Sequence, residues 1–437
     1  MEHARILTLI HQTAPALVAD GDHFTQGFYQ HLLTSHPALH HTFNPANQAS
    51  GAQARSLLDA IVLFVTRYDE LETLGDEARR IAAKHVSVDV QPGQYAAVGA
   101  SLLATIQASL GAAATPEVML AWELAYGRIA GVLVGLEAAT YQQQQAQPGG
   151  WAGFKPFVVA RVQAESPDVR SFYLVPQDGA PLPAYRPGQF ISLAVNLPYF
   201  PYRQLRQYSL SDAPHQPYYR ITVKRGVQTG DAPAALVSNY LHDAVGEGSV
   251  VSVHAPAGEF CLAPGATAPL VLLAGGLGIT PFMAMLEQLA EELSARPVLL
   301  IHAVPDADHQ PFGRRLRELA QRPGVRVRSL YQAAPEPTAG NGPGLLRPLD
   351  AADGPLTADH LAALLPTDWA GTEFYCCGPL AFMRHVYALL AQRGITDCHF
   401  EEFGPSHRVA EPAAAAAPPA ARCPYGHQLV PQPEPVA

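Results

Sequence analysis

The sequence predicts a multidomain protein with an all-helical domain first, an antiparallel β-barrel second and an α/β domain built on a parallel sheet third. Three changes in the pattern of residues predict this order. Residues 1–147 carry apolar side chains at helical spacing, and residues 151–263 carry short β runs between turn residues. Residues 264–405 alternate apolar strands with helices. Residues 406–437 are rich in proline and alanine, which predicts a disordered tail.

The predicted helical domain has a recognisable last helix. Thr115-Pro116 is a typical helix start, because threonine caps the first turn and proline suits the first helical position. The glutamine run 142–145 and the following Pro148-Gly149-Gly150 end the helix and mark a linker. Apolar residues at helical spacing include Leu57, Ile61, Phe64, Leu120, Leu124 and Leu133.

The second and third domains are predicted from their strands. Barrel strands are expected at residues 157–162, 171–175, 190–195, 219–223 and 250–254, between segments rich in Pro, Gly and Asp. Later strands are expected at residues 270–273, 298–302, 325–330 and 374–376, with helices near 282–293, 314–320 and 380–392. This second alternation is the pattern of a parallel sheet with crossover helices.

Composition restricts the partners and the cell compartment. A net charge of −10 argues against nucleic acid or an anionic membrane as the main partner, since both attract basic surfaces. The five cysteines form no C-x-x-C pair, which argues against a zinc site or a disulfide framework. The sequence has no secretory signal pattern and no apolar run of about 18 residues. We therefore expect a soluble, cytoplasmic monomer without a membrane span.

Arg206-Gln207-Tyr208-Ser209 places a cation, an aromatic ring and a hydroxyl at one strand end. The guanidinium can neutralise a pyrophosphate, and the tyrosine ring can pack against an isoalloxazine. Ser209 can hydrogen-bond near the reactive nitrogen of that ring. An ordinary strand of mixed polarity would also explain these four residues, so they become informative only with the motifs around them.

A glycine-rich turn, Gly275–Pro281, lies between an apolar strand and a helix. Gly276 and Gly278 allow the backbone to approach phosphate, and the helix dipole adds attraction for the anion. Thr280-Pro281 suits a helix start. The dinucleotide-binding residues predicted in this turn are Gly276, Leu277, Gly278, Ile279, Thr280 and Pro281.

Five motifs in order resemble the ferredoxin-reductase family of flavoproteins over residues 155–405. They are Arg186-Pro187-Gly188-Gln189-Phe190, Ala255-Pro256-Ala257-Gly258-Glu259-Phe260, the glycine-rich turn, Tyr375-Cys376-Cys377-Gly378-Pro379 and Glu402-Phe403-Gly404-Pro405. The resemblance implies FAD bound by Phe190 and residues 206–209, and a nicotinamide near Cys377. It also implies that Phe403 covers the flavin, with Glu402, Gly404 and Pro405 beside it.

The choice between NADH and NADPH is open from the sequence. A 2′-phosphate requires a basic pocket after the second strand of the last domain, where Arg314, Arg315 and Arg317 are candidates. A solvated helix face explains the same arginines as well. Cys376 and Cys377 are expected to pack or to face the nicotinamide, because adjacent cysteines rarely form an unstrained disulfide.

An all-helical domain before a flavin reductase indicates an electron acceptor such as haem. His36, His40 and His41 lie around a proline turn and are predicted to be a surface cluster that binds no metal. His85 is different, because the small residues Ala82 and Ala83 before it leave room for a flat macrocycle.

The helical domain resembles the globin domain of flavohaemoglobins, and residues 1–405 as a whole resemble that family. The matching residues are Tyr29, Pro37, Phe43, Gln53, Leu57, Lys84, His85, Tyr95, Trp122, Tyr126 and Glu137. The resemblance implies haem b with His85 as the iron ligand, and Tyr95 and Glu137 hydrogen-bonded behind it. It places Tyr29 and Gln53 beside bound dioxygen, Leu57 and Phe43 around the haem, and Lys84 at the haem–flavin contact.

The resemblance implies nitric oxide dioxygenase activity. NAD(P)H would reduce FAD, FAD would pass single electrons to haem, and haem with bound dioxygen would convert nitric oxide to nitrate. Two alternatives stay open. One is an oxygen or redox sensor whose tail recruits a partner through residues 422–427, and the other is a general NAD(P)H-dependent ferric or quinone reductase with a vestigial globin.

Three features depart from the family pattern. Phe190 stands where many members have a tyrosine against the flavin, so a hydroxyl contact is lost while stacking survives. Residues 226–236 form a long Pro/Ala-rich stretch on the flavin side. Glu402 adds a negative charge where a smaller or apolar residue is common, which is expected to shift the flavin potential.

Overall fold

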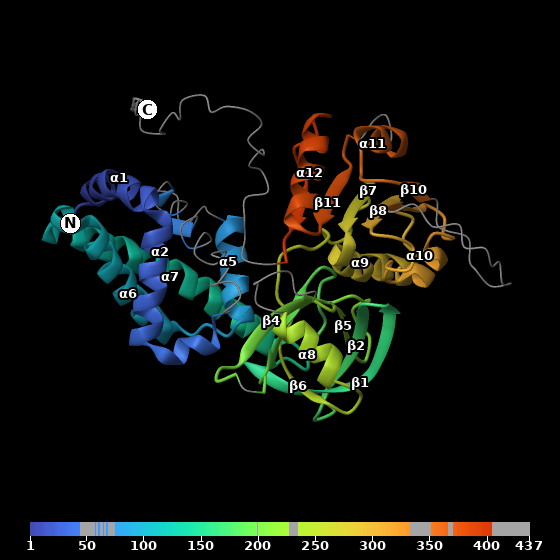
Figure 1. The fold of residues 1–437 in the computed structure, drawn as a ribbon, viewed down its shortest axis with the longest axis horizontal. Helices are drawn as coiled ribbons and strands as arrows, with labels where there is room; N and C mark the ends of the chain where they lie inside the picture. The colour runs from blue at the N-terminus through green and yellow to red at the C-terminus, as the bar shows by residue number, and fades with distance from the viewer. Residues whose placement is uncertain are drawn as a thin grey trace, which may run out of the picture.

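The computed structural model describes residues 1–43, 57, 60–61, 64, 67–68, 75–198, 200–226, 235–332, 351–365 and 370–403. In this part of the chain, helices form the first domain, and the strands form two six-stranded sheets in the domains that follow. Every pairing in the first sheet is antiparallel and every pairing in the second is parallel. The predicted fold class is confirmed (Figure 1).

The helical domain is built around a long last helix. Its described elements are α1 (His3–Ala19), α2 (Gly21–Ser35), η1 (Pro37–His41), α5 (Gly75–Ser87), α6 (Pro92–Leu110), η3 (Gly111–Ala113) and α7 (Pro116–Ala146). Helix α7 begins as predicted, since the Thr115 hydroxyl accepts a hydrogen bond from the Val118 N–H at 3.3 Å and Pro116 follows it. Phe24, Phe28 and Trp122 are buried in the core between the helices.

Two helices, Pro92–Ala113 and Pro116–Ala146, are long and apolar enough to cross a membrane by length and composition alone. Core helices of globular domains meet the same criterion. Both helices contribute buried residues to the core of the helical domain, including Leu102, Ile106, Trp122 and Leu133. The absence of a membrane span therefore stays a prediction.

Helices α6 and α7 approach closely at Gly99. A methyl group on Gly99 would lie 2.4 Å from Cε1 of Tyr126, so only glycine fits without moving the ring. The Tyr126 hydroxyl donates a hydrogen bond to the Tyr95 carbonyl at 2.6 Å. The packing of these two helices thus determines where Tyr95 lies.

The barrel domain is a six-stranded antiparallel sheet in which most neighbouring strands are not consecutive in the chain, and one short helix precedes its last strand. Its elements are β1 (Phe154–Ser166), β2 (Val169–Pro176), β3 (Phe190–Val195), β4 (Gln204–Ser209), β5 (Tyr219–Lys224), α8 (Leu236–Ala244) and β6 (Val250–His254), with strand order β4-β3-β6-β1-β2-β5. Helix α8 was not predicted. Strands β3 and β4 pair with Phe190 opposite Ser209 and Ile191 opposite Tyr208, so the two predicted flavin motifs lie side by side.

The α/β domain has strand order β10-β9-β8-β7-β11-β12. Its elements are β7 (Leu270–Gly275), η4 (Gly276–Gly278), α9 (Ile279–Glu291), β8 (Val298–Val304), α10 (Gly313–Leu319), β9 (Val325–Tyr331), β10 (Ala351–Asp353), α11 (Ala358–Leu364), β11 (Glu373–Cys377), α12 (Leu380–Ala391) and β12 (His399–Glu401). The chain order reverses between β7 and β11, and ligands of such sheets bind beyond the carboxyl ends of the strands at that point. The glycine-rich turn and Cys377 lie at those two strand ends.

The close α6–α7 contact makes a stability prediction. Replacing Gly99 with alanine is expected to lower the free energy of unfolding of the helical domain by about 1–3 kcal/mol, because the Tyr126 ring must move. Gly131→Ala on α7 is the matched control, since a methyl group there meets nothing within 4 Å. Its better helix propensity should stabilise the domain by up to about 1 kcal/mol. Hydrogen–deuterium exchange of α6 and α7 across a urea series measures both effects, and equal stability of the two variants would contradict the packing.

Candidate functional site

Side chains from α5, α6 and α7 meet at His85. The His85 Nδ1 atom lies 2.7 Å from Oε1 of Glu137 and 3.0 Å from the Tyr95 hydroxyl. The Tyr95 hydroxyl donates to the same Glu137 oxygen at 2.5 Å. Glu137 is only 2% exposed. The structure therefore brings together the three residues that the sequence assigned to the proximal side of a haem.

This arrangement fixes the proton on the imidazole. A carboxyl oxygen at 2.7 Å favours a proton on Nδ1, which leaves the lone pair on Nε2. About a third of the His85 side chain is exposed, and its recorded hydrogen bonds within the described chain use Nδ1 alone. Burial, followed by the hydrogen bond to Glu137, raises the pKa of Tyr95, so its hydroxyl stays protonated. An imidazole whose Nδ1 is hydrogen-bonded and whose Nε2 has no recorded partner in the described chain suits an iron ligand.

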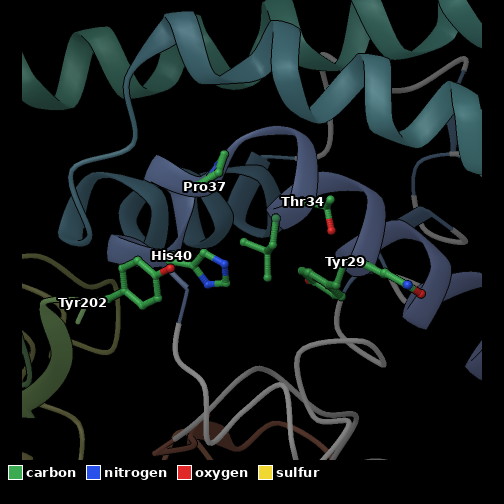
Figure 2. A pocket seen from close by; sticks show the side chains of 7 residues that line it. Tyr29, Thr34, Pro37, His40 and Tyr202 are labelled. Atoms are coloured by element: carbon green, nitrogen blue, oxygen red, sulfur yellow. The ribbon is translucent and has the colours of Figure 1, made fainter. Parts of the chain in front are cut away.

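Tyr29, Phe43 and Leu57 pack against the same helical core. The Tyr29 ring meets Phe43 edge-on, with 5.7 Å between ring centroids. Burial raises the pKa of Tyr29, so its hydroxyl remains a donor. Tyr29 also lines a cavity of about 400 Å³ with residues of α2 and η1 (Figure 2). Gln53, the other predicted residue of this side, lies outside the described residues.

The histidines of the proline turn contact the barrel domain. His40 stacks on Tyr202 with 4.4 Å between ring centroids (Figure 2). The ring of His41 meets Tyr202 edge-on. The Arg203 N–H donates to Nδ1 of His41 at 3.1 Å. His41 is exposed and His36 and His40 are partly exposed, so the cluster lies at the surface as predicted. Its contact with barrel residues about 160 positions away in the sequence was not predicted.

The predicted flavin residues line the β3–β4 surface. Gln207 and Tyr208 are half-buried, while Ser209 is buried opposite Phe190. Burial lowers the pKa of Arg206, whose recorded hydrogen bond in the described chain goes to the Leu205 carbonyl at 2.7 Å. A half-buried cation with no recorded carboxylate partner among the described residues suits a bound pyrophosphate.

Lys84 connects this surface to the other two domains. Its ammonium group lies 5.3 Å from the centre of the Phe190 ring, which is a cation–π distance. Burial lowers the pKa of Lys84, and the carboxylates of Glu401 and Glu402 oppose that shift. Burial raises the pKa of Glu401, opposed chiefly by Lys84. Lys84 of α5 thus interacts with Phe190 of a barrel strand and with Glu401 of β12, the last described strand.

Glu401 is a site residue that the sequence analysis missed. The motif at the end of the folded region drew attention to Glu402, but Glu401 is the residue that pairs with Cys377 in the parallel sheet. It also exerts the larger electrostatic effect on Lys84. Phe403 is 50% exposed. Gly404 and Pro405 lie outside the described residues.

The glycine-rich turn is packed on one side and open on the other. Gly276 adopts the left-handed region with φ +52°, and a methyl group there would meet nothing within 4 Å. At Gly278 a methyl group would lie 2.1 Å from the Cys377 carbonyl oxygen. The Thr280 hydroxyl donates to the Leu277 carbonyl at 3.0 Å. Ile279 and Pro281 are buried at the start of α9.

The adjacent cysteines are buried free thiols. Burial raises the pKa values of Cys376 and Cys377 well above the ordinary thiol value. Cys377 lies beside Ala274 of β7 in the parallel sheet, next to the glycine-rich turn. Because both thiols are buried and protonated, Cys376 and Cys377 are better explained as packing residues or as residues that face the nicotinamide than as a redox pair.

Two of the three arginines considered for a 2′-phosphate are paired with carboxylates. Arg315 donates two hydrogen bonds to Glu287, at 2.8 and 2.7 Å. Arg314 pairs with Glu318 at 3.1 Å and is largely exposed. Arg317 has a buried Nε without a recorded partner in the described chain. The choice between NADH and NADPH stays open.

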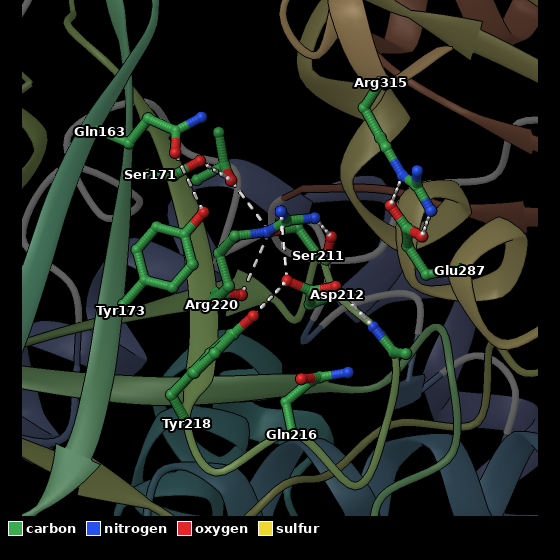
Figure 3. Close-up of polar contacts among 12 residues, drawn as sticks. Gln163, Ser171, Tyr173, Ser211, Asp212, Gln216, Tyr218, Arg220, Glu287 and Arg315 are labelled. Carbon is green, nitrogen blue, oxygen red and sulfur yellow. Dashed lines mark hydrogen bonds and ion pairs between the residues drawn. The ribbon is translucent and has the colours of Figure 1, made fainter. Parts of the chain in front are cut away.

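Arg220 on β5 lies within a hydrogen-bonded group of barrel residues (Figure 3). It pairs with Asp212 at 3.1 Å and donates to the Ser211 carbonyl. Its guanidinium also lies 5.2 Å from the centre of the Phe312 ring, just before α10. These contacts fix the β4–β5 side of the barrel against the domain that carries the glycine-rich turn.

Comparison with known proteins identifies the family. A globin family model matches residues 26–133, and an oxidoreductase NAD-binding domain model matches residues 272–387. A flavohemoprotein of Deinococcus radiodurans is 43% identical over 410 residues, which cover 92% of this chain and 97% of that protein. The chain belongs to the flavohaemoglobin (flavohemoprotein) family. A flavohemoprotein of Bacillus subtilis is 36% identical over 409 residues, which cover 93% and 98% of the two chains.

Solved structures support the same relationship. A flavohemoglobin of Malassezia yamatoensis, solved with bound FAD and haem, matches 92% of this flavohaemoglobin and 99% of its own chain, with a TM-score of 0.78 and 25% identity. The FAD/NAD-binding domain of a nitric oxide dioxygenase from Vibrio cholerae is 35% identical, with a TM-score of 0.51. It covers 57% of this chain and 99% of its own.

Replacement of His85 tests its predicted role as the iron ligand. His85→Ala is expected to abolish stoichiometric haem binding, because it removes the imidazole nitrogen predicted to bind the iron. The FAD content should not change, since the barrel is separate. Tyr95→Phe is the matched control, because removal of a supporting hydrogen bond typically costs about 10–100-fold in affinity or activity but leaves the ligand in place. Pyridine haemochrome and extracted flavin assays measure both cofactors. Full haem content in His85→Ala would contradict the assignment.

Proposed function

We propose that this flavohaemoglobin is an NAD(P)H-dependent nitric oxide dioxygenase that uses haem b, FAD and NADH or NADPH. The observation that carries the proposal is the hydrogen-bonded set of His85, Tyr95 and Glu137 in a chain whose later part matches an oxidoreductase NAD-binding domain. The similarity to the FAD/NAD domain of the Vibrio cholerae nitric oxide dioxygenase adds support. Bound haem supplies the metal at which dioxygen and nitric oxide combine into nitrate, and bound flavin converts a hydride into single electrons.

On the proximal side, this chain increases the basicity of the ligand imidazole. Glu137 accepts the Nδ1 proton of His85 at 2.7 Å, so electron density is directed toward Nε2. Tyr95 donates to the same oxygen and orients it. If haem binds here, a more basic histidine ligand would favour activation of dioxygen over simple storage.

On the opposite side, Tyr29 supplies a proton donor. Its raised pKa keeps the hydroxyl protonated at physiological pH, so it can donate to an oxygen atom in the pocket. Phe43 meets its ring edge-on and limits its motion. Gln53 and Leu57 are proposed to complete this pocket, as the family resemblance implies.

In the reductase part of the chain, some residues are proposed to bind FAD or the dinucleotide, and others to form the contact with the helical domain. Arg206 is proposed to neutralise the flavin pyrophosphate, and Tyr208 and Phe190 to pack around the ring. The glycine-rich turn and Cys377 are proposed to hold the dinucleotide. Lys84 and Glu401 lie where the helical domain meets the flavin surface, and are proposed to orient the two cofactors toward each other.

The two alternative functions receive less support. A vestigial globin would have no need of a 2% exposed glutamate held by a tyrosine and a histidine, because a buried carboxyl group is expensive to maintain. The sensor hypothesis depends on residues 422–427, which lie outside the described residues.

The proposed activity is tested by product analysis. Protein reduced with NADH, exposed to dioxygen and mixed with nitric oxide is expected to yield equimolar nitrate. Tyr29→Phe should slow the reaction, because it removes the donor while preserving ring packing. The same variant should keep wild-type NADH-driven flavin reduction, which serves as the internal control. Consumption of nitric oxide without nitrate would reject the dioxygenase proposal.

The contact role of Lys84 makes a separate prediction. Lys84→Met is expected to leave the rate of flavin reduction by NADH unchanged, since the dinucleotide turn is in another domain. Haem reduction by the reduced flavin should become slower, because the charge that faces Phe190 and Glu401 is lost. Lys84→Arg is the matched variant and should restore most of the rate. Stopped-flow absorbance separates the two steps, and unchanged haem reduction in Lys84→Met would contradict the contact role.

A further inference from the structure

A buried histidine lies beneath the glycine-rich turn. His302, near the end of β8, is fully buried, and its Nε2 lies 2.9 Å from the Gly276 carbonyl oxygen. In the parallel sheet it pairs with Ala274 on β7 and Ser329 on β9, so it occupies the centre of the sheet. The sequence analysis assigned it no role, although it is a polar residue within an apolar strand.

The chemistry of this contact fixes the state of the imidazole. A carbonyl oxygen can only accept, so Nε2 carries the proton and donates it to Gly276. The other nitrogen, Nδ1, is buried without a recorded partner in the described chain. Burial lowers the pKa of His302 to about 4, which keeps the ring neutral at physiological pH. An unsatisfied buried nitrogen is unfavourable, so an apolar residue would serve packing better.

The held carbonyl determines which way the next amide points. In a planar trans peptide, the carbonyl of one residue and the N–H of the next point in opposite directions. Because the Gly276 carbonyl is held toward His302, the Leu277 N–H points away from the sheet. Gly276 is open on its outer side, since a methyl group there would meet nothing within 4 Å.

The remainder of the turn is held by other contacts. The Leu277 carbonyl accepts from the Thr280 hydroxyl, and Gly278 packs tightly against the Cys377 backbone. Gly276 adopts a left-handed φ. The peptide between Gly276 and Leu277 is held by a side chain from a neighbouring strand, that of His302. N–H groups at the first turn of a helix have no intrahelical acceptor and attract anions.

We propose that His302 is a positioning residue for the nicotinamide dinucleotide. By holding the Gly276–Leu277 peptide, it presents the Leu277 N–H to the pyrophosphate. This role rests on the proposed use of NAD(P)H. It does not depend on nitric oxide chemistry, because the reductase half binds the dinucleotide before any electron reaches the helical domain.

Equilibrium binding of ADP-ribose to the oxidised holoenzyme tests the role. ADP-ribose carries the pyrophosphate and lacks the nicotinamide, so calorimetry reports binding without turnover. His302→Leu is expected to weaken binding about tenfold, the effect of one hydrogen bond to a charged group. His302→Gln can still donate an N–H to Gly276 and should remain within about threefold of wild type.

A matched control comes from the barrel. His254 is also buried, also has an unpaired nitrogen and also faces a backbone carbonyl, that of Ala255 at 3.3 Å. His254→Leu removes a comparable group far from the turn and should leave ADP-ribose affinity unchanged. Haem content, FAD content and melting temperature are recorded for every variant to show that each is folded.

Two results would overturn the proposal. If folded His302→Leu bound ADP-ribose with wild-type affinity, His302 would be a packing residue without a role in dinucleotide binding. In the wild-type protein, ADP-ribose should slow amide hydrogen exchange at Leu277, and unchanged exchange would also overturn it even if the variants fail to fold. Neither measurement uses nitric oxide. If the dioxygenase assay failed, both measurements would therefore still test the role of His302.

Discussion

The hydrogen bond between His85 and Glu137 is the interaction on which the helical domain depends. It joins α5 to α7 across 52 positions of sequence and places a nearly fully buried carboxyl group against an imidazole. Burial of such a group is unfavourable unless it is hydrogen-bonded, and here Tyr95 from α6 and His85 both satisfy one oxygen. The same contact selects the imidazole tautomer. One hydrogen bond therefore both satisfies the buried carboxyl group and leaves Nε2 of His85 as the nitrogen that can bind iron. The close approach of α6 and α7 at Gly99 supports it by placing Tyr126 against the Tyr95 backbone.

Helix α5 also carries the connection between domains. His85 faces the helical core, while the preceding Lys84 faces Phe190 of the barrel and Glu401 of the α/β domain. Adjacent residues of a helix point about 100° apart, so one turn of α5 can serve two cofactor sites. On another side of the helical domain, His40 and His41 contact Tyr202 and Arg203. These contacts help to hold the first domain against the barrel, together with the hydrogen bond from Gln144 to the Pro256 carbonyl. Arg220 contacts Phe312 of the third domain.

Much of this organisation could be predicted from the sequence because it depends on local patterns. The order of domains follows from hydrophobic periodicity, and the start of α7 follows from Thr115-Pro116. His85, Tyr95 and Glu137 were named from the family resemblance, and the structure brings them together. Residues that depend on long-range pairing were missed. Glu401 becomes prominent only because β12 pairs with β11, and His302 only because β8 lies beside β7. The contact between His40 and Tyr202 joins parts of the chain that no local pattern relates.

The most direct test of the central claim is the iron–histidine stretching frequency of the ferrous, ligand-free protein, measured by resonance Raman. If Glu137 accepts the Nδ1 proton and strengthens the donor nitrogen of His85, Glu137→Gln must lower this frequency while haem remains bound. Glu123→Gln, an exposed change on the same helix, should leave it unchanged. The same frequency in wild type and Glu137→Gln would contradict the account, because the buried carboxyl group would then have no influence on the iron ligand.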